Sequence, residues 1–193
     1  MEFDYTPGDL FKPGPNHSYN ACVGKNGGPY DFFAYASGYF RAGNLVLESV
    51  VKRDCLLDLL IYPTFYLYRH AFELSLKSLI VKFQSLGEPV SFPKRHELSK
   101  LWAVVKPLFE RDRKEFDGGV CAIDKMEALI VDMEALDHSA QVFRFPEDRD
   151  GQPFLQDRNL INYARLVPMS QAEKVFEHWY YTVESMIEDR NDY

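Results

Sequence analysis

The stretch "FYLYRHAFELSLKSLI", residues 65–80, decides the fold class. Apolar side chains recur in it every three or four positions, which is the spacing of an α-helix with one buried face. On a helical wheel the large apolar residues of this region gather on one side: Phe65, Tyr68, Phe72, Leu76, Leu79 and Phe83. We expect Ser75, Ser78 and Lys82 on the opposite side, facing solvent. The pattern predicts a helix over residues 58–86.

A second polar strip lies beside the apolar stripe of this helix. Arg69, Glu73 and Lys77 follow one another at intervals of four residues, and His70 lies next to them. Charges of alternating sign at this spacing form ordinary ion pairs along a helix. A strip that faced a groove would instead bind an anion through Arg69 and move protons through His70 or Glu73. Both interpretations remain open at this point.

The composition of the chain indicates one packed domain. The chain has 193 residues, of which 46% are hydrophobic and 26% charged. A net charge of -7 argues against a general nucleic-acid coat, because phosphate binding needs an excess of Lys and Arg. The three cysteines include no CxxC pair, so neither a zinc knuckle nor a disulfide framework is indicated. We expect no metal and no cofactor. We see no signal peptide and no membrane-spanning run, and we expect a cytoplasmic protein that does not bind membranes.

The rest of the chain predicts an all-α protein. Residues 1–29 are rich in Pro, Gly and Asn and are expected to form an extended arm with Phe3, Tyr5 and Phe11 as anchors. Residues 30–193 are expected to form a bundle of about five helices. Besides the helix already described, these cover residues 31–53, 94–107 (ending or kinking at Pro107), 122–140 and a last segment that begins at a Ser170–Glu173 capping box.

Two connections between these helices have their own patterns. "RDRKEFDGG", residues 111–119, is highly charged and is expected to be a solvated link. "QVFRFPEDRDGQPFLQ", residues 141–156, places two short extended pieces around an Asp-Gly pair. This pattern predicts a small β-hairpin that projects from the bundle.

Three short motifs occur in order along the predicted bundle. They are E-x-x-x-K at Glu73 and Lys77, H-x-L-x-x-L beginning at His96, and R-[YF]-P beginning at Arg144. Together, over roughly residues 30–190, they resemble the HEPN superfamily, whose helical domains are common in prokaryotic toxin–antitoxin, nucleotidyltransferase-associated and antiviral phage-defence systems. The resemblance implies a bundle of four or five helices that often pairs as a homodimer.

The resemblance also implies a chemistry, because many members of this superfamily are metal-independent ribonucleases. Their signature is an Arg followed, after four to six residues, by a His. The chain departs from that signature, since none of its histidines has an Arg at this distance upstream: His17, His70, His96, His138 and His178. The resemblance therefore supports the fold better than it supports RNA cleavage.

We expect an HEPN-like binding or assembly module of a prokaryotic defence or toxin–antitoxin system, acting as a homo-oligomer or with a partner protein. The alternative is a diverged ribonuclease with His70 and His96 as its catalytic residues, and a nucleotide or small-molecule sensor also remains open. The candidate ligand-binding residues, for RNA or a nucleotide, are Arg69, Glu73, Lys77, Asp137, Ser139 and Arg144. The strip is either open to a ligand or closed by Arg144 pairing with Glu73 or Asp137.

Overall fold

The computed structural model describes most of the chain, namely residues 10, 12–24, 27–28, 30–52, 56–93, 97–118 and 121–192. The chain divides into two units, residues 1–30 and 31–193. The described part of the first unit contains a short 3-10 helix, His17–Tyr19, which begins where the Asn16 side chain accepts a hydrogen bond from the Ser18 N–H. The expected anchors Phe3, Tyr5 and Phe11 lie outside the described residues.

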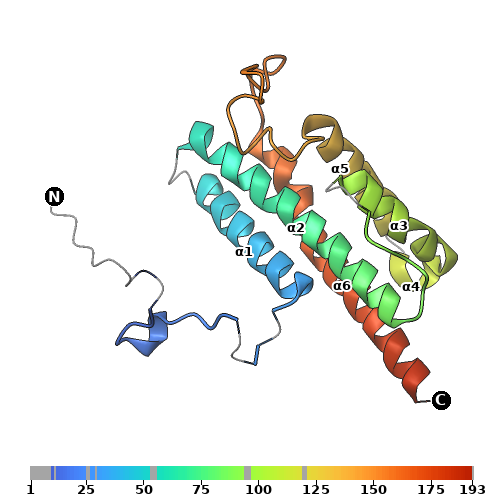
Figure 1. Cartoon of the computed structure of the whole chain (residues 1–193). Coiled ribbons are helices and arrows are strands. Elements are labelled where there is room, and N and C mark those ends of the chain that lie inside the picture. The colour runs from blue at the N-terminus through green and yellow to red at the C-terminus, as the bar shows by residue number, and fades with distance from the viewer. Residues whose placement is uncertain are drawn as a thin grey trace. The chain divides into compact units, whose positions relative to one another are not determined.

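The second unit is built from helices, with no strand in the part of the chain that the structure describes (Figure 1). The prediction of an all-α class is therefore confirmed. The helices are α1 (Phe32–Val51), α2 (Leu57–Ser85), α3 (Leu98–Arg111), α4 (Arg113–Asp117), α5 (Ala122–Leu136) and α6 (Val167–Asn191), with a 3-10 turn η2 (Tyr163–Leu166) before α6. Among the described helices, none combines the length and the apolar character needed to cross a bilayer.

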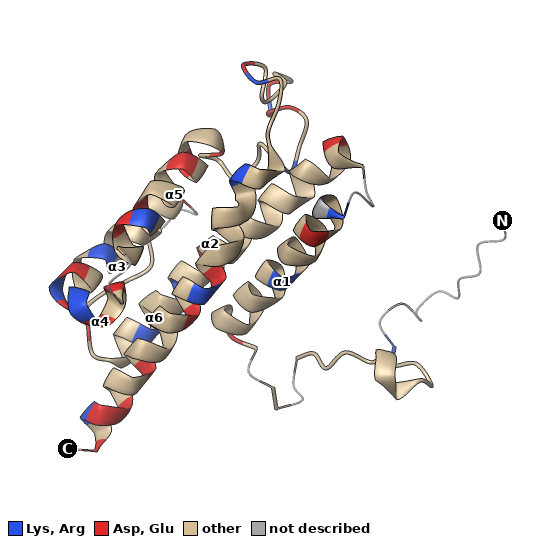
Figure 2. Ribbon diagram, turned by 180° about the vertical axis from the view of Figure 1, so that it is seen from behind, with Lys and Arg blue, Asp and Glu red and all other residues tan. Residues whose placement is uncertain are grey.

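Helix α2 is the centre of this unit. It packs against α1, α3 and α6, while α5 packs against α3 and α6 (Figure 1). Charged residues of both signs are interspersed along α3 and α4 and at the C-terminal end of α6 (Figure 2). Because α2 has neighbours on several sides, residues from most of its circumference are removed from water.

The prediction that Ser75, Ser78 and Lys82 of α2 face solvent is wrong. Ser75 is 2% exposed and Ser78 is 5% exposed. The Ser78 hydroxyl donates a hydrogen bond to the Ser75 carbonyl at 2.8 Å, so a small polar side chain is satisfied inside the core. Lys82 is half-buried and pairs with Glu184 of α6. A wheel describes only its own helix, whereas the packing of three neighbours decides which faces are buried.

The link expected over residues 111–119 is not simply solvated. It contains the short helix α4, in which Phe116 is fully buried. The Phe116 carbonyl accepts a hydrogen bond of 2.8 Å from the indole N–H of Trp179 in α6. The charged residues of the link form ion pairs with one another, as Arg113 does with Asp117 at 3.1 Å. One aromatic residue among many charges is enough to fix this segment to the core.

Several predicted helix ends also differ from the structure. Helix α6 begins at Val167, and the capping box is not formed, because the Ser170 hydroxyl donates to the Val167 carbonyl and Glu173 accepts a hydrogen bond from Asn44. Helix α3 continues through Pro107 to Arg111. Beyond that proline the buried residues Leu108 and Phe109 keep the chain packed against the core. The predicted start of this helix near Lys94 lies outside the described residues.

The predicted β-hairpin is wrong, because residues 141–156 contain one isolated antiparallel bridge, Glu147 with Pro153, instead of two strands. The chain does reverse at the Asp-Gly pair, where Gly151 has a φ of +76° and the Asp148 N–H donates to the Gln152 carbonyl. Pro153 is one of the two bridge residues and Pro146 immediately precedes the other. Neither proline carries an N–H, so the ladder of hydrogen bonds cannot extend.

Aromatic residues fill the centre of the bundle. Phe109 lies 4.4 Å from Trp179 and 4.8 Å from Phe116, measured between ring centroids. Trp102 and Phe176 join the same cluster. These rings come from α3, α4 and α6, so the cluster joins the α3 side of the bundle to its long last helix. Aromatic pairs at such distances stabilise a core beyond their buried area.

A close approach of α1 to α2 at Gly43 provides a test of this packing. A methyl group on Gly43 would lie 3.0 Å from the Tyr68 ring, whereas one on Gly38 would meet nothing within 4 Å. Tyr68 is fully buried and its hydroxyl donates to the Asn44 side chain at 2.8 Å, so the ring has no room to move. Gly38→Ala is expected to raise the free energy of unfolding by about 0.5–1 kcal/mol through helix propensity.

Gly43→Ala gains the same propensity, but the overpacking costs about 1–3 kcal/mol, so we expect a net loss of stability. Urea unfolding followed by circular dichroism measures both variants against the native chain. Equal stabilisation by the two substitutions would contradict a tight contact between Gly43 and Tyr68.

Candidate functional site

Four of the candidate residues form one buried network of charges. Arg69 is 2% exposed, Glu73 is 5% exposed and Asp137 is 1% exposed. Arg69 Nη1 lies 3.7 Å from Glu73 Oε2, and Arg69 Nε lies 3.7 Å from Asp137 Oδ2. Lys77 Nζ lies 2.7 Å from Glu73 Oε1, at the more exposed end of the strip. The intervals of four residues therefore do correspond to ion pairs along α2, joined by a carboxylate from elsewhere in the chain.

Asp137 carries this network from α2 to the segment after α5. Helix α5 ends at Leu136, because Asp137 has φ −140° and ψ 69°. The Asp137 carbonyl accepts a hydrogen bond of 3.2 Å from Arg69 Nε. Its Oδ1 accepts hydrogen bonds from the backbone N–H groups of Gln141 and Val142. One carboxylate thus holds both the buried guanidinium and the start of the loop that follows.

Arg144, in that loop, does not belong to the buried network. Its side chain is exposed, and its guanidinium lies over the ring of Tyr66 at 5.5 Å and over the ring of Phe145 at 5.3 Å. Within the described residues the side chain of Arg144 makes no hydrogen bond or ion pair, so the strip is not closed by Arg144 pairing with Glu73 or Asp137. The Arg69–Glu73–Asp137 network closes without it.

His70 also contacts Tyr66. Its ring is stacked on Tyr66 with 5.8 Å between centroids and meets Tyr39 edge-on at 4.5 Å. Burial lowers the pKa of His70 below its ordinary 6.5, the charges of Lys77, Arg69 and Arg144 lower it further, and Glu73 opposes them. The imidazole is therefore neutral at pH 7. Tyr66 contacts both His70 and Arg144, and these three residues form a second group beside the buried network.

The remaining candidates lie apart from these two groups or outside the described chain. Ser139 is exposed in the turn after α5 and makes no hydrogen bond within the described residues. His96 lies outside the described residues. The structure thus brings together Arg69, Glu73, Lys77 and Asp137 in one group, and His70 with Arg144 in the other.

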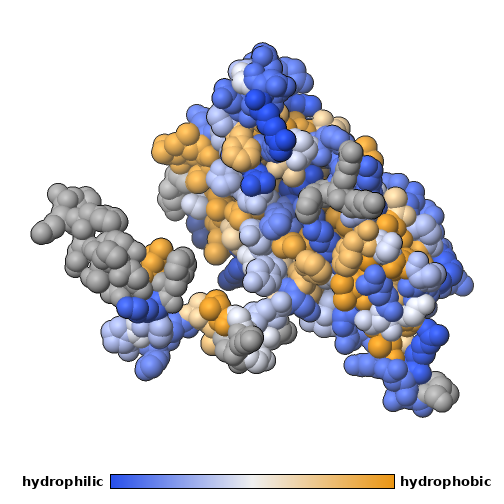
Figure 3. All heavy atoms as spheres, viewed as in Figure 1, coloured by the Kyte–Doolittle hydropathy of each residue, from blue (hydrophilic) through white to orange (hydrophobic). Residues whose placement is uncertain are grey.

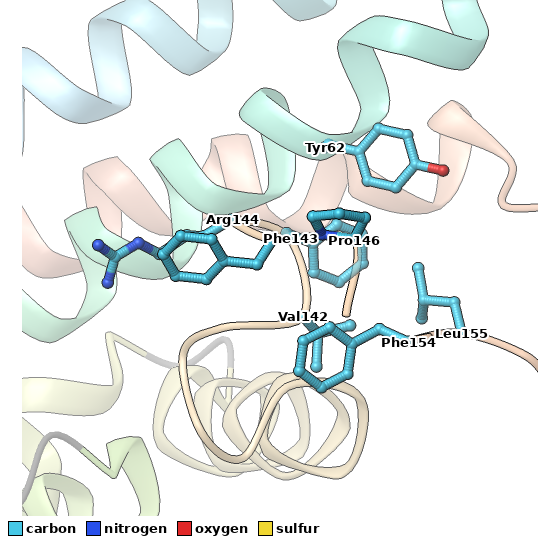
Figure 4. Close-up of a pocket in the computed structure, with 8 residues that line it drawn as sticks. Tyr62, Val142, Phe143, Arg144, Pro146, Phe154 and Leu155 are labelled. Carbon is cyan, nitrogen blue, oxygen red and sulfur yellow. The ribbon is translucent and has the colours of Figure 1, made fainter. Parts of the chain in front are cut away.

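A pocket next to Arg144 is a feature that the sequence pattern did not reveal. It has a volume of about 430 Å³ and is lined by Tyr62, Val142, Phe143, Arg144, Phe145, Pro146, Phe154 and Leu155. Figure 4 shows Arg144 at one edge, with its guanidinium directed away from Tyr62 and Leu155. The signal in the sequence is the run of apolar and aromatic residues on both sides of the Asp-Gly turn, which a hairpin interpretation treats as strand residues.

A wider groove adjoins this pocket and shares Tyr62, Phe154 and Leu155 with it. Its volume is about 780 Å³. The other lining residues come from the end of α1, the start of α2 and the segment before α6: Val50, Leu57, Asp58, Ile61, Arg158, Asn159, Leu160, Ile161, Asn162 and Tyr163. Most of the side chains from α1 and α2 are aliphatic, which distinguishes this groove from the aromatic pocket beside it.

A third cluster has ligand atoms of the type that metals prefer. Oxygen or nitrogen atoms of Glu97, Glu134 and His138 lie within 4.8 Å of one another. Glu134 accepts a hydrogen bond from the Ser99 N–H in the first turn of α3 and contacts His138 Nδ1 at 3.2 Å. Glu97 pairs with Lys100 at 2.7 Å. Capping of α3 and ion pairing account for these carboxylates, so we assign no metal to them.

The buried network predicts a strong effect of removing its cation. Arg69→Met leaves Glu73 and Asp137 as buried carboxylates without their shared partner, and this is expected to lower the free energy of unfolding by about 3–5 kcal/mol. Arg165→Met, at an exposed arginine of η2, is the matched control and is expected to change stability by less than about 0.5 kcal/mol. Chemical denaturation measures both, and equal stabilities of the two variants would rule out a structural role for Arg69.

The chain was compared with protein-family models, curated proteins and solved structures. No family model, curated protein or solved structure matches the chain.

Proposed function

We propose that this chain is an HEPN-like binding or assembly module of a prokaryotic defence or toxin–antitoxin system, acting without RNA cleavage and assembling with a second copy of itself. The order of the three sequence motifs supports the family. The burial of Arg69 and Glu73 supports the absence of cleavage, and it is the observation that carries the proposal.

A ribonuclease of the metal-independent type needs a cation in contact with the phosphate and a histidine in reach of the ribose hydroxyl. Arg69 has the right charge, but it is 2% exposed and its guanidinium is directed to Glu73 and Asp137. Turning it toward a substrate would break its ion pairs with two buried carboxylates, which is costly. The strip on α2 therefore stabilises the bundle in preference to binding a phosphate.

The groove at the start of α2 supports the assembly part of the proposal. Leu57 is 49% exposed and Leu160 is 92% exposed, although both line the groove. Leu56 and Leu59, in the same region of the chain, are 69% and 63% exposed. Apolar side chains gather near this end of α2 on the surface (Figure 3). An apolar surface of this kind is typical of an interface between protein chains.

Assembly through this groove is tested by sedimentation velocity. The native chain is expected to sediment as a dimer, and Leu160→Glu as a monomer, because a charge on this exposed leucine would be buried at the interface without a partner. Val131→Glu, at a residue of α5 that is 57% exposed, is the matched control and is expected to leave the dimer intact. A native chain that stays monomeric at all concentrations would refute the proposed assembly.

A second candidate function is a diverged ribonuclease, and the group around Tyr66 favours it. A neutral His70 is in the correct state to accept a proton, and Arg144 contacts the same Tyr66 ring with its guanidinium donors unpaired within the described residues. This arrangement offers a base and a cation without using Arg69.

Incubation with total RNA separates the two functions. We expect no cleavage by the native chain, and the same result for His70→Ala, His96→Ala and Arg144→Ala. Cleavage by the native chain that disappears in His70→Ala or in Arg144→Ala would instead establish the ribonuclease. Circular dichroism of each variant serves as the control for folding.

A further inference from the structure

The Arg144 guanidinium differs from other cations of this protein because, among the described residues, its contacts are with aromatic rings. Its guanidinium lies within 6 Å of the centroids of two rings, Tyr66 at 5.5 Å and Phe145 at 5.3 Å. Other arginines, such as Arg111 and Arg113, form ion pairs with carboxylates. Ring contacts leave the N–H groups of a guanidinium available, and a guanidinium binds a phosphate with two parallel hydrogen bonds.

The pocket beside Arg144 has the character of a site for a flat ring. Three of its eight lining residues are phenylalanines, Tyr62 adds a fourth aromatic ring, and none of the eight is acidic. Its volume of about 430 Å³ falls within the range of about 300–1,000 Å³ that is usual for small-molecule sites. Aromatic walls stack well on the faces of nucleobases.

The loop that carries Arg144 is held in place by contacts that a ligand would not disturb. Phe143 is 4% exposed and stacks on Phe65 of α2 with 4.0 Å between centroids. The Arg144 N–H donates to the Gln141 carbonyl, while the Gln141 N–H donates to Asp137 Oδ1. The buried Arg69 network thus positions Arg144 before any ligand arrives, which lowers the entropic cost of binding.

We propose that this pocket, with Arg144 at its edge, binds an aromatic ring that carries a phosphate, namely a nucleoside monophosphate, either free or as the terminal unit of an RNA. The base lies among the aromatic side chains, and the phosphate meets the guanidinium. An apolar ligand would leave the arginine unused, and inorganic phosphate would leave the pocket empty. This inference goes beyond the proposed assembly and does not depend on it.

The small number of polar groups in the pocket indicates weak selectivity among nucleobases. Apart from Arg144, the Tyr62 hydroxyl is the one polar side-chain group among the lining residues. Discrimination between bases needs several hydrogen-bonding groups at their edges. Stacking on rings is sequence-tolerant, because every base has an aromatic face. We therefore expect AMP, GMP, UMP and CMP to bind with similar affinities.

Isothermal titration calorimetry of the full chain tests the site with AMP and UMP as probes. We expect each nucleotide to bind, and adenosine and ribose 5-phosphate to bind at least about tenfold more weakly, because each lacks one of the two contacts. No binding of either nucleotide would overturn the proposal. Ribose 5-phosphate that binds as tightly as AMP would also overturn it, since the pocket would then contribute nothing.

Substitution of the arginine isolates its role. Arg144→Ala is expected to weaken AMP binding about tenfold to a hundredfold through loss of a charge-assisted contact. Arg149→Ala removes the same charge from an exposed position of the same loop and is expected to leave the affinity unchanged. Equal weakening by the two substitutions would overturn the proposal, because it would indicate a general charge effect. If Arg144→Ala fails to fold, Arg144→Lys keeps the charge and is still expected to bind at least about tenfold more weakly.

Short oligoribonucleotides with and without a 5′-phosphate distinguish the two sources of the ligand. Preference for the phosphorylated oligonucleotide over AMP, lost in Arg144→Ala, would identify an RNA end as the ligand. Preference for AMP, with the same dependence on Arg144, would identify a free nucleotide. Affinities for both that do not change in Arg144→Ala would overturn the assignment of this site.

Discussion

The burial of Arg69 is the constraint on which much of the structure depends. A guanidinium in the middle of a helix packed on several sides is stable only if carboxylates compensate its charge. Glu73 is supplied by the same helix, and Asp137 comes from the residue that follows α5. Because Asp137 also binds the N–H groups of the next loop, the end of α5 and the course of residues 141–145 follow from that one charge. The position of Arg144 is a further consequence.

The sequence predicted the fold class because apolar residues recur every three or four positions over most of the length of α2. It failed where the outcome depends on neighbours that no local pattern encodes. Ser75 and Ser78 look like solvent-facing residues on a wheel, yet α2 is covered on that side too. Phe116 is one aromatic among charges, and its burial depends on Trp179, 63 residues later.

The candidate site likewise contains some contacts that the sequence predicts and others that only tertiary packing determines. The pairs of Arg69 with Glu73 and of Glu73 with Lys77 follow from a spacing of four residues and are visible in the sequence. The meeting of Asp137 with Arg69 joins residues 68 positions apart, and only tertiary packing determines it. Pairing of Arg144 with Glu73 or Asp137 was one of two alternatives, and the guanidinium instead contacts the rings of Tyr66 and Phe145. The pocket beside it arises from a loop that prolines prevent from becoming a sheet.

The two tryptophans lie together in the core, with 5.9 Å between their ring centroids. Trp179 donates its indole N–H to the Phe116 carbonyl, whereas the indole N–H of Trp102 is buried without a hydrogen-bond partner in the described part of the chain. Both chromophores are therefore shielded from water and close enough to exchange excitation energy. Tryptophan fluorescence therefore reports on the contact between α3, which carries Trp102, and α6, which carries Trp179. Loss of this contact would expose the indole rings to water and shift their emission to longer wavelength.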